Sequence, residues 1–292
     1  MVFASVQVPG CRGLVDIAHR GSSGQAPENT LAAVHLAVAQ QTRFVEVDVQ
    51  RSADCELVIM HDATLERTTD AADVFPGRAP WRVGDFTFAE LRRLDAGSSF
   101  AGYFAGEPIP TLREVIDVLG PDTGLLLEIK DPHRHPGIEL AVYQELCAIP
   151  DYLGAAVRAG GLVVQSFDHE SMGVFHGCAP EIPVGLLFDE RPTDGQLVSA
   201  GRWARQVNTD YRVTDAALIE RIHRLGMTTS VYTVNAERDM RRLADTGVDG
   251  IITNYPTLLN AVGWASELTS ESLLLQSVED IVGHDLPAAV DA

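Results

Sequence analysis

The sequence predicts an α/β protein whose parallel strands close into a TIM-type (β/α)8 barrel with a small inserted capping segment. Two observations support this fold class. The chain has 292 residues, which suits a barrel that usually occupies about 250 residues in one domain. Short apolar runs also alternate with helical stretches, and strands that alternate with helices form βαβ units in a parallel sheet.

Nine apolar runs have the length and composition of strands. They are residues 14–18, 44–49, 57–60, 125–129, 162–165, 184–188, 206–208, 229–234 and 250–253. Only Gln50 to Glu56 separate the second run from the third, whereas a parallel crossover needs a dozen or more residues. We therefore interpret 57–60 as an antiparallel arm, which leaves eight barrel strands and returns His61 to the barrel mouth.

Amphipathic stretches lie between many of these runs. They are residues 31–41, 89–94, 111–119, 216–225 and 236–245. Gly226 and Gly247 follow the last two, as expected where a glycine ends a helix just before a strand.

The segment 62–110 is too long for an ordinary loop between a strand and a helix and contains a helix of its own, predicted over 88–94. We interpret it as an insertion that caps the active-site face. The predicted organisation is one barrel domain over 1–265, followed by an acidic tail or helix over 266–292.

The net charge argues against a nucleic-acid partner. The chain carries 41 acidic and 22 basic residues, a net charge of −19, whereas nucleic-acid binding depends on Lys and Arg.

No apolar stretch approaches the ~20 residues of a membrane span, and the N-terminus lacks the pattern of a secretory signal. We expect a cytoplasmic protein whose four scattered cysteines are reduced. The oligomeric state is open.

His19 and Arg20 follow the first predicted strand, where barrel enzymes hold catalytic groups. Histidine transfers protons near neutral pH, and arginine presents a planar fork of donors to phosphate. A surface loop with a helix cap is the alternative, and Asn29 and Thr30 are both good N-cap residues.

Glu46 and Asp48 alternate with valines in the second strand and therefore point to the same face. Two carboxylates inside a barrel repel each other unless a cation joins them. Oxygen ligands favour Mg²⁺ or Ca²⁺, with Mn²⁺ also compatible. The alternatives are solvation at the strand end or pairing with a nearby arginine.

Glu128 and Lys130 share one face at the end of a later strand, so Glu128 is a candidate third carboxylate. Lys130 either binds phosphate or neutralises the carboxylates, and a simple Glu–Lys pair is the alternative. Asp62 either orients the imidazole of His61 or caps the next turn. His133 and His135 follow the strand that carries Glu128, and a second metal site at these two histidines is a further possibility.

Several separated motifs resemble the glycerophosphodiester phosphodiesterases, within the phosphatidylinositol phospholipase C-like phosphodiesterase superfamily. The resemblance covers roughly residues 15 to 260 and is carried, in order, by segments 18–30, 46–48, 61–69, 86–97, 109–112, 127–130, 165–167, 232–235 and 250–256. The family often has Trp where this chain has Tyr232, near the expected position of the substrate alcohol.

The resemblance implies metal-dependent hydrolysis of glycerophosphodiesters to an alcohol and sn-glycerol 3-phosphate. It implies one divalent ion on Glu46, Asp48 and Glu128, and His19 and His61 as the acid–base pair. By the same resemblance, Arg20, Lys130 and Tyr232 contact a small-molecule substrate. The alternatives are a lysophospholipase D-like or phosphatidylinositol phospholipase C-like enzyme, or a non-catalytic barrel that binds glycerophosphodiesters.

Overall fold

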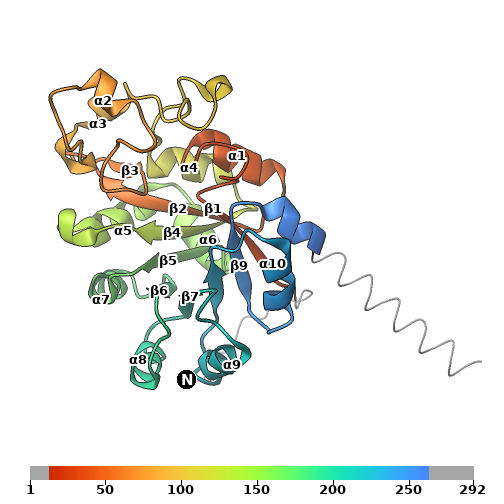
Figure 1. The fold of residues 1–292 in the computed structure, drawn as a ribbon. Coiled ribbons are helices and arrows are strands. Elements are labelled where there is room, and N and C mark those ends of the chain that lie inside the picture. The colour runs from red at the N-terminus through yellow and green to blue at the C-terminus, as the bar shows by residue number, and fades with distance from the viewer. Residues whose placement is uncertain (1–12, 263–292) are drawn as a thin grey trace, which may run out of the picture.

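The computed structural model describes residues 13–262, and within them eight parallel strands form a closed barrel (Figure 1). The sheet order is β1-β9-β8-β7-β6-β5-β4-β2-β3, and pairing of β1 with β2 closes the barrel. The strands are β1 (Val15–His19), β2 (Phe44–Arg51), β3 (Leu57–Ile59), β4 (Gly124–Ile129), β5 (Leu162–Ser166), β6 (Val184–Phe188), β7 (Gln206–Asp210), β8 (Ser230–Tyr232) and β9 (Gly250–Thr253). The predicted fold class is confirmed.

The short strand β3 is the predicted antiparallel arm. It pairs with the far end of β2, with Val49 opposite Ile59 and Arg51 opposite Leu57. The two strands are too close in sequence for a parallel crossover, so the chain turns back directly. This hairpin returns the chain to the same end of the barrel at which β2 carries its carboxylates.

Helices lie on the outer face of the barrel, and two short α-helices lie in the insertion that follows β3 (Figure 1). The barrel helices are α1 (Leu31–Ala39), α4 (Leu112–Leu119), α5 (Ile138–Ala148), α6 (Tyr152–Ala159), α7 (His169–Cys178), α8 (Asp194–Ala200), α9 (Ala216–Arg224) and α10 (Glu237–Ala244), and those of the insertion are α2 (Ala71–Val74) and α3 (Phe88–Leu91). Gly226 and Gly247 have positive φ after α9 and α10, as predicted. Helix α3 is shorter than the predicted 88–94, because the chain leaves the helix at Arg92.

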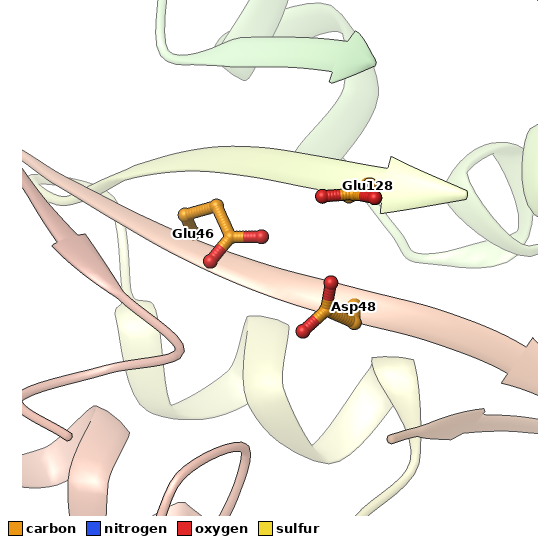
Figure 2. A group of neighbouring side chains, drawn as sticks. All are labelled: Glu46, Asp48 and Glu128. Atoms are coloured by element: carbon orange, nitrogen blue, oxygen red, sulfur yellow. The ribbon is translucent and has the colours of Figure 1, made fainter. Parts of the chain in front are cut away.

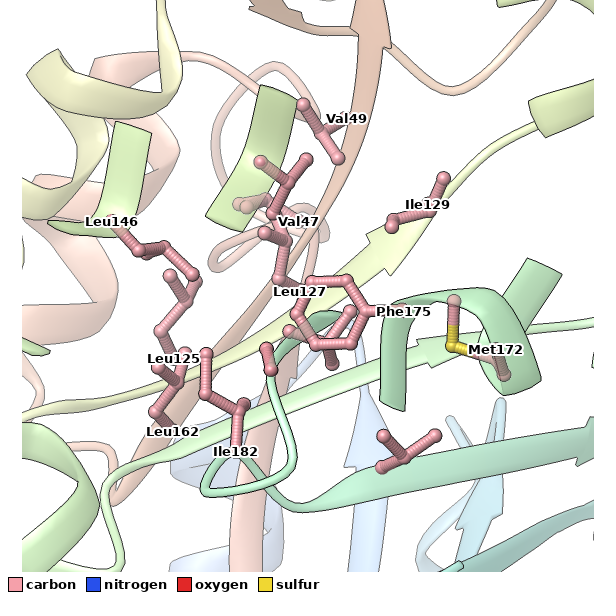
Figure 3. Packing of buried hydrophobic residues seen from close by; sticks show 14 of the residues in the cluster. Val47, Val49, Leu125, Leu127, Ile129, Leu146, Leu162, Met172, Phe175 and Ile182 are labelled. Atoms are coloured by element: carbon pink, nitrogen blue, oxygen red, sulfur yellow. The ribbon is translucent and has the colours of Figure 1, made fainter. Parts of the chain in front are cut away.

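The main hydrophobic core lies between the strands and the helices (Figure 3). Val45, Val47 and Val49 of β2 are fully buried in it, together with Leu125 and Leu127 of β4. Burying each such side chain stabilises the fold by about 1.5–3 kcal/mol. Because side chains alternate along a strand, this outward packing turns Glu46 and Asp48 toward the barrel interior.

The insertion between β3 and α4 has a hydrophobic core of its own. Phe86, Leu65 and Leu91 are fully buried there, against Val58 and Met60 of the β3 arm. The insertion therefore rests on the same arm that leads to His61. The expected tail over 266–292 lies outside the described residues. Among those that are described, we find no helix with the length and apolar character needed to cross a membrane.

Candidate active site

The predicted site residues meet at the C-terminal ends of the barrel strands, around a cavity of about 180 Å³. Its lining residues are His19, Arg20, Glu46, His61, Glu128, Lys130, Gln165, Phe167, Leu187, Tyr232, Thr233 and Ile252. Seven of the eight predicted site residues are in this set. The eighth, Asp48, is buried against Glu46 and Glu128. One cavity thus collects residues that are more than 200 positions apart in the sequence.

Glu46, Asp48 and Glu128 form a buried carboxylate cluster (Figure 2). Asp48 and Glu128 are direct neighbours across the parallel pair β2–β4, and Glu46 points to the same side of β2 as Asp48. One oxygen from each residue lies within 4.8 Å of the other two. No other group of this kind occurs within residues 13–262, and the open possibility of a metal site at His133 and His135 gains no support there.

The three carboxylates strongly affect one another's ionisation. Burial and the charges of Asp48 and Glu128 raise the pKa of Glu46 well above its ordinary value. Burial and the charge of Asp48 raise the pKa of Glu128 to about 7. Burial also acts to raise the pKa of Asp48, but the nearby charges of Arg20 and Lys130 outweigh it and lower that pKa. Three buried carboxylates are therefore not all ionised without a further cation.

The arrangement fits a divalent cation held by oxygen ligands. Lys130 Nζ lies 2.6 Å from Glu128 Oε1 and 3.7 Å from Asp48 Oδ1. Among the residues that the structure describes, Asp48 Oδ1 is buried without a hydrogen-bond partner. A buried carboxylate oxygen without a partner is energetically costly, and a metal ion at this oxygen would remove that cost. The all-oxygen ligand set suits Mg²⁺, Ca²⁺ or Mn²⁺.

Arg20 contacts two carboxylates of the cluster, one through its backbone and one through its side chain. Its main-chain N–H donates to Glu46 Oε2 at 2.9 Å, while its Nε lies 3.3 Å from Asp48 Oδ2. Its Nη1 donates to Glu28 Oε1 at 2.8 Å. Arg20 therefore contacts the carboxylate cluster and also lines the cavity.

His19 is held by an asparagine from the end of the barrel. Its Nδ1 lies 2.7 Å from Asn254 Oδ1, a carbonyl oxygen that only accepts hydrogen bonds. The Nδ1 atom therefore carries the proton, and Nε2, which has no hydrogen-bond partner among residues 13–262, can accept one. Burial and the positive charge of Arg20 lower the pKa of His19 to about 4, so the imidazole is neutral at neutral pH.

His61 is oriented by the residue that follows it. Its Nδ1 lies 2.6 Å from Asp62 Oδ1, so Asp62 accepts from the imidazole rather than capping the next turn. Burial lowers the pKa of His61. The bond with Arg67 holds the pKa of Asp62 at about 2, so this carboxylate stays ionised. As at His19, Nδ1 carries the proton, and no partner of Nε2 lies in the part of the chain that the structure describes.

Tyr232 and Phe167 form an aromatic wall of the cavity. Their rings meet edge to face with centroids 5.8 Å apart. The Tyr232 hydroxyl is 3.4 Å from Asp189 Oδ1, and burial together with the charge of Asp189 raises the pKa of the phenol. Tyr232 therefore lines the cavity, and its contact with a substrate stays a prediction.

Sequence reasoning missed three polar residues that support the site. Asn29 is not the N-cap of α1, which is Thr30, but instead donates to Asp48 Oδ2 at 2.8 Å. Asn254 holds His19. The side chain of Gln50 continues the row of Glu46 and Asp48 along β2, and this period of two could have identified it.

Comparisons with known proteins show what this chain is similar to. Residues 19–258 match the model of the glycerophosphoryl diester phosphodiesterase family. A glycerophosphodiester phosphodiesterase of Bacillus subtilis is 34% identical over 261 residues, covering 85% of this chain and 86% of that protein. One from Caldanaerobacter subterraneus is 36% identical over 249 residues, covering 84% and 96% respectively.

A solved structure shows a similar fold. It is an Oleispira antarctica phosphodiesterase in complex with the product sn-glycerol 3-phosphate, with a TM-score of 0.76 and 31% identity, covering 86% of this chain and 96% of that one. The family match spans most of the chain and includes every residue of the cavity described above. The chain therefore belongs to the glycerophosphoryl diester phosphodiesterase family.

Proposed function

We propose that this enzyme hydrolyses glycerophosphodiesters to an alcohol and sn-glycerol 3-phosphate, with one divalent metal ion and two histidines. The observation that carries the proposal is the single cavity lined by two carboxylates of the cluster, both histidines and two cations. Each type of group has a distinct use in phosphodiester cleavage, and here all of them face the same space.

In this proposal Glu46, Asp48 and Glu128 hold the metal ion. When bound, such an ion supplies positive charge to a non-bridging phosphate oxygen and lowers the pKa of an attacking hydroxyl or water. It also stabilises the ionised form of the three buried carboxylates. Mg²⁺ and Ca²⁺ are the leading candidates, and Mn²⁺ is compatible with the same ligands.

Arg20 and Lys130 bind the phosphate in this proposal. Both line the cavity, and both remain charged because neighbouring carboxylates raise their pKa despite burial. They supply local positive charge in a protein whose net charge is −19. Tyr232, with Phe167 beside it, contacts the alcohol portion of the substrate.

His19 and His61 are the proposed proton carriers. Each has its Nδ1 proton fixed by a carbonyl or carboxylate oxygen, which leaves Nε2 able to accept a proton. One imidazole takes the proton of the attacking group at Nε2, and the other, once protonated at Nε2 from solvent, gives that proton to the departing alkoxide. The two histidines, one at the end of β1 and one just after β3, face the same cavity.

The test is the release of sn-glycerol 3-phosphate from glycerophosphocholine by metal-stripped protein, with and without Mg²⁺, Ca²⁺ or Mn²⁺. We expect release only when metal is added. Release without any metal would contradict the metal assignment. Products from a lysophospholipid, or a cyclic phosphate from an inositol lipid, in place of this reaction would contradict the substrate assignment.

A further inference from the structure

Arg67, in the insertion after β3, holds two carboxylates at once. Its Nε and Nη2 donate to Asp62 Oδ2 and Oδ1 at 2.6 and 2.9 Å. Its Nη1 and Nη2 donate to Glu28 Oε2 and Oε1, both at 2.8 Å. The planar guanidinium therefore makes a bidentate contact on each of two edges, which restricts both carboxylates in position and in rotation.

Each of these carboxylates holds a residue of the proposed site. Asp62 Oδ1 accepts from His61 Nδ1 at 2.6 Å, and Glu28 Oε1 accepts from Arg20 Nη1 at 2.8 Å. A continuous chain of hydrogen bonds thus runs from His61 through Arg67 to Arg20. It joins the end of the β3 arm to the loop after β1, two segments that the strand ladders do not fix to each other at this point.

We propose that Arg67 is a positioning residue, which sets the imidazole of His61 and the guanidinium of Arg20 relative to each other through Asp62 and Glu28. The proposal rests on the proposed roles of His61 and Arg20. Arg67 itself is not among the described residues that line the 180 Å³ cavity. We therefore expect its effect on the reaction to be indirect, through His61 and Arg20.

Loss of the Arg67 side chain should lower the reaction rate rather than the stability of the fold. The Arg67 side chain is 48% exposed, and exposed ion pairs contribute little to folding. Without the arginine, however, Asp62 and Glu28 repel each other and gain freedom to rotate. A small displacement of a reacting group can lower the rate about 10²-fold, so a change with little structural cost has a large catalytic consequence.

An alternative role for Arg67 is simply to attach the insertion to the barrel. Other contacts already do this. Glu107 accepts from the backbone of Ala32 in α1 at 3.0 Å, and Asp54 accepts from the backbone of Phe88 at 2.8 Å. The buried core of the insertion also packs on the β3 arm. Loss of Arg67 should therefore leave the insertion in place.

The kinetic test compares Arg67→Ala and Arg67→Lys with Arg92→Ala as the matched control. Arg92 lies in the same insertion and pairs with Glu114 at 3.0 Å, away from the cavity lining. We expect Arg67→Ala to lower kcat about 10- to 100-fold with an unchanged melting temperature, and Arg67→Lys to recover only part of it, because an ammonium cannot form two bidentate contacts. Guanidinium at low millimolar concentration should partly restore Arg67→Ala.

A double variant shows whether Arg67 acts through Asp62. If it does, Arg67→Ala combined with Asp62→Asn should lower kcat by clearly less than the product of the two single losses, because both changes break the link through Asp62 and only Arg67→Ala also breaks the link through Glu28. Independent, multiplicative losses would overturn the proposal. So would a kcat for Arg67→Ala equal to that of Arg92→Ala.

A measurement without substrate separates this proposal from the proposed function. The Nδ1 proton of His61 should give a downfield NMR resonance protected from exchange in the intact protein and in Arg92→Ala, but not in Arg67→Ala. Persistence of that resonance in Arg67→Ala would overturn the positioning role, whatever the enzyme cleaves. Its loss, in a protein that releases no sn-glycerol 3-phosphate, would support the link while contradicting the proposed function.

Discussion

Asn29 and Asp48 form a reciprocal pair at the base of the carboxylate cluster. Asn29 Nδ2 donates to Asp48 Oδ2 at 2.8 Å, and the backbone N–H of Asp48 donates to Asn29 Oδ1 at 3.3 Å. Asn29 adopts a left-handed conformation with φ of 58° and is almost fully buried. Its amide therefore fixes the orientation of one proposed metal ligand, leaving Asp48 Oδ1 directed elsewhere.

We expect Asn29→Ala to weaken metal binding by about 10- to 100-fold, because groups that orient a ligand commonly contribute that much. The measurement is a calorimetric titration of metal-stripped protein with Mg²⁺, Ca²⁺ or Mn²⁺. Asn260→Ala is a matched control, since Asn260 also donates to a buried carboxylate, that of Asp16 at the other end of β1. Equal affinities in the two variants would contradict the role given to Asn29.

Metal binding should release protons in a manner that depends on pH. The pKa of Glu128 is about 7 in the metal-free protein, because of burial and the charge of Asp48. Below that pH the carboxyl is protonated and must lose its proton to become a ligand. We therefore expect about one proton released per ion at pH 6, with a further contribution from Glu46, and a declining number above pH 7.

Calorimetry in buffers of different ionisation enthalpy measures this proton release. Because the pKa of Glu128 is raised, protons compete with the metal below about pH 7. The apparent metal affinity should therefore increase as the pH rises toward 7, and the contribution of Glu128 should then level off. Glu128→Gln removes the titrating carboxyl. It should weaken metal binding and abolish the part of the pH dependence of proton release that comes from Glu128. A release that is independent of pH between 5 and 8 would contradict the assignment of Glu128 as a ligand.

His19→Ala and His61→Ala should each lower kcat by at least ~10²-fold. Both imidazoles line the cavity, and each is held in its own place through Nδ1. One histidine therefore cannot take over the role of the other. The pKa of His19 is about 4, so its protonation should affect the rate only as the pH falls toward that value. His35→Ala is the control, because His35 is exposed on α1. Retained activity in either site variant would remove that histidine from the mechanism.

The strand pattern predicted most of the fold and the acidic part of the site, because both depend on local spacing. The alternation of Glu46 and Asp48 with buried valines is visible in the sequence, and so is the short link that makes β3 antiparallel. The hydrogen bonds that hold these groups are not visible. His19 is bound by Asn254, and 235 positions separate the two residues.

The contact of Asn29 with Asp48 could not be predicted from the sequence. Its position before α1 made helix capping the simpler interpretation, and only the packing of the loop against β2 turns its amide toward Asp48. The role of Arg67 is hidden for the same reason. Its partners Glu28 and Asp62 lie 39 and 5 positions away, and nothing in local periodicity relates the three.

Gln50 should be needed for the placement of His61. It is fully buried on β2, two residues beyond Asp48, and its Nε2 donates to the backbone carbonyls of Met60, His61 and Asp62 at 2.9, 3.2 and 2.7 Å. The Oε1 atom of this amide lies 3.2 Å from the buried His135 Nε2. One side chain therefore attaches the β3 arm to the strand that carries two of the proposed metal ligands.

We expect Gln50→Ala to lower the free energy of unfolding by roughly 1–3 kcal/mol, because buried carbonyl groups lose their donor, and to lower kcat by about 10-fold or more as His61 shifts. Gln50→Glu should also lower kcat, since a carboxylate has no donor for these carbonyls. Thr193→Ala, which removes the N-cap of α8 far along the chain, costs about 1 kcal/mol and should leave kcat unchanged. Urea unfolding and steady-state kinetics on the three variants separate the two effects, and a normal kcat in Gln50→Ala would show that His61 is held without this amide.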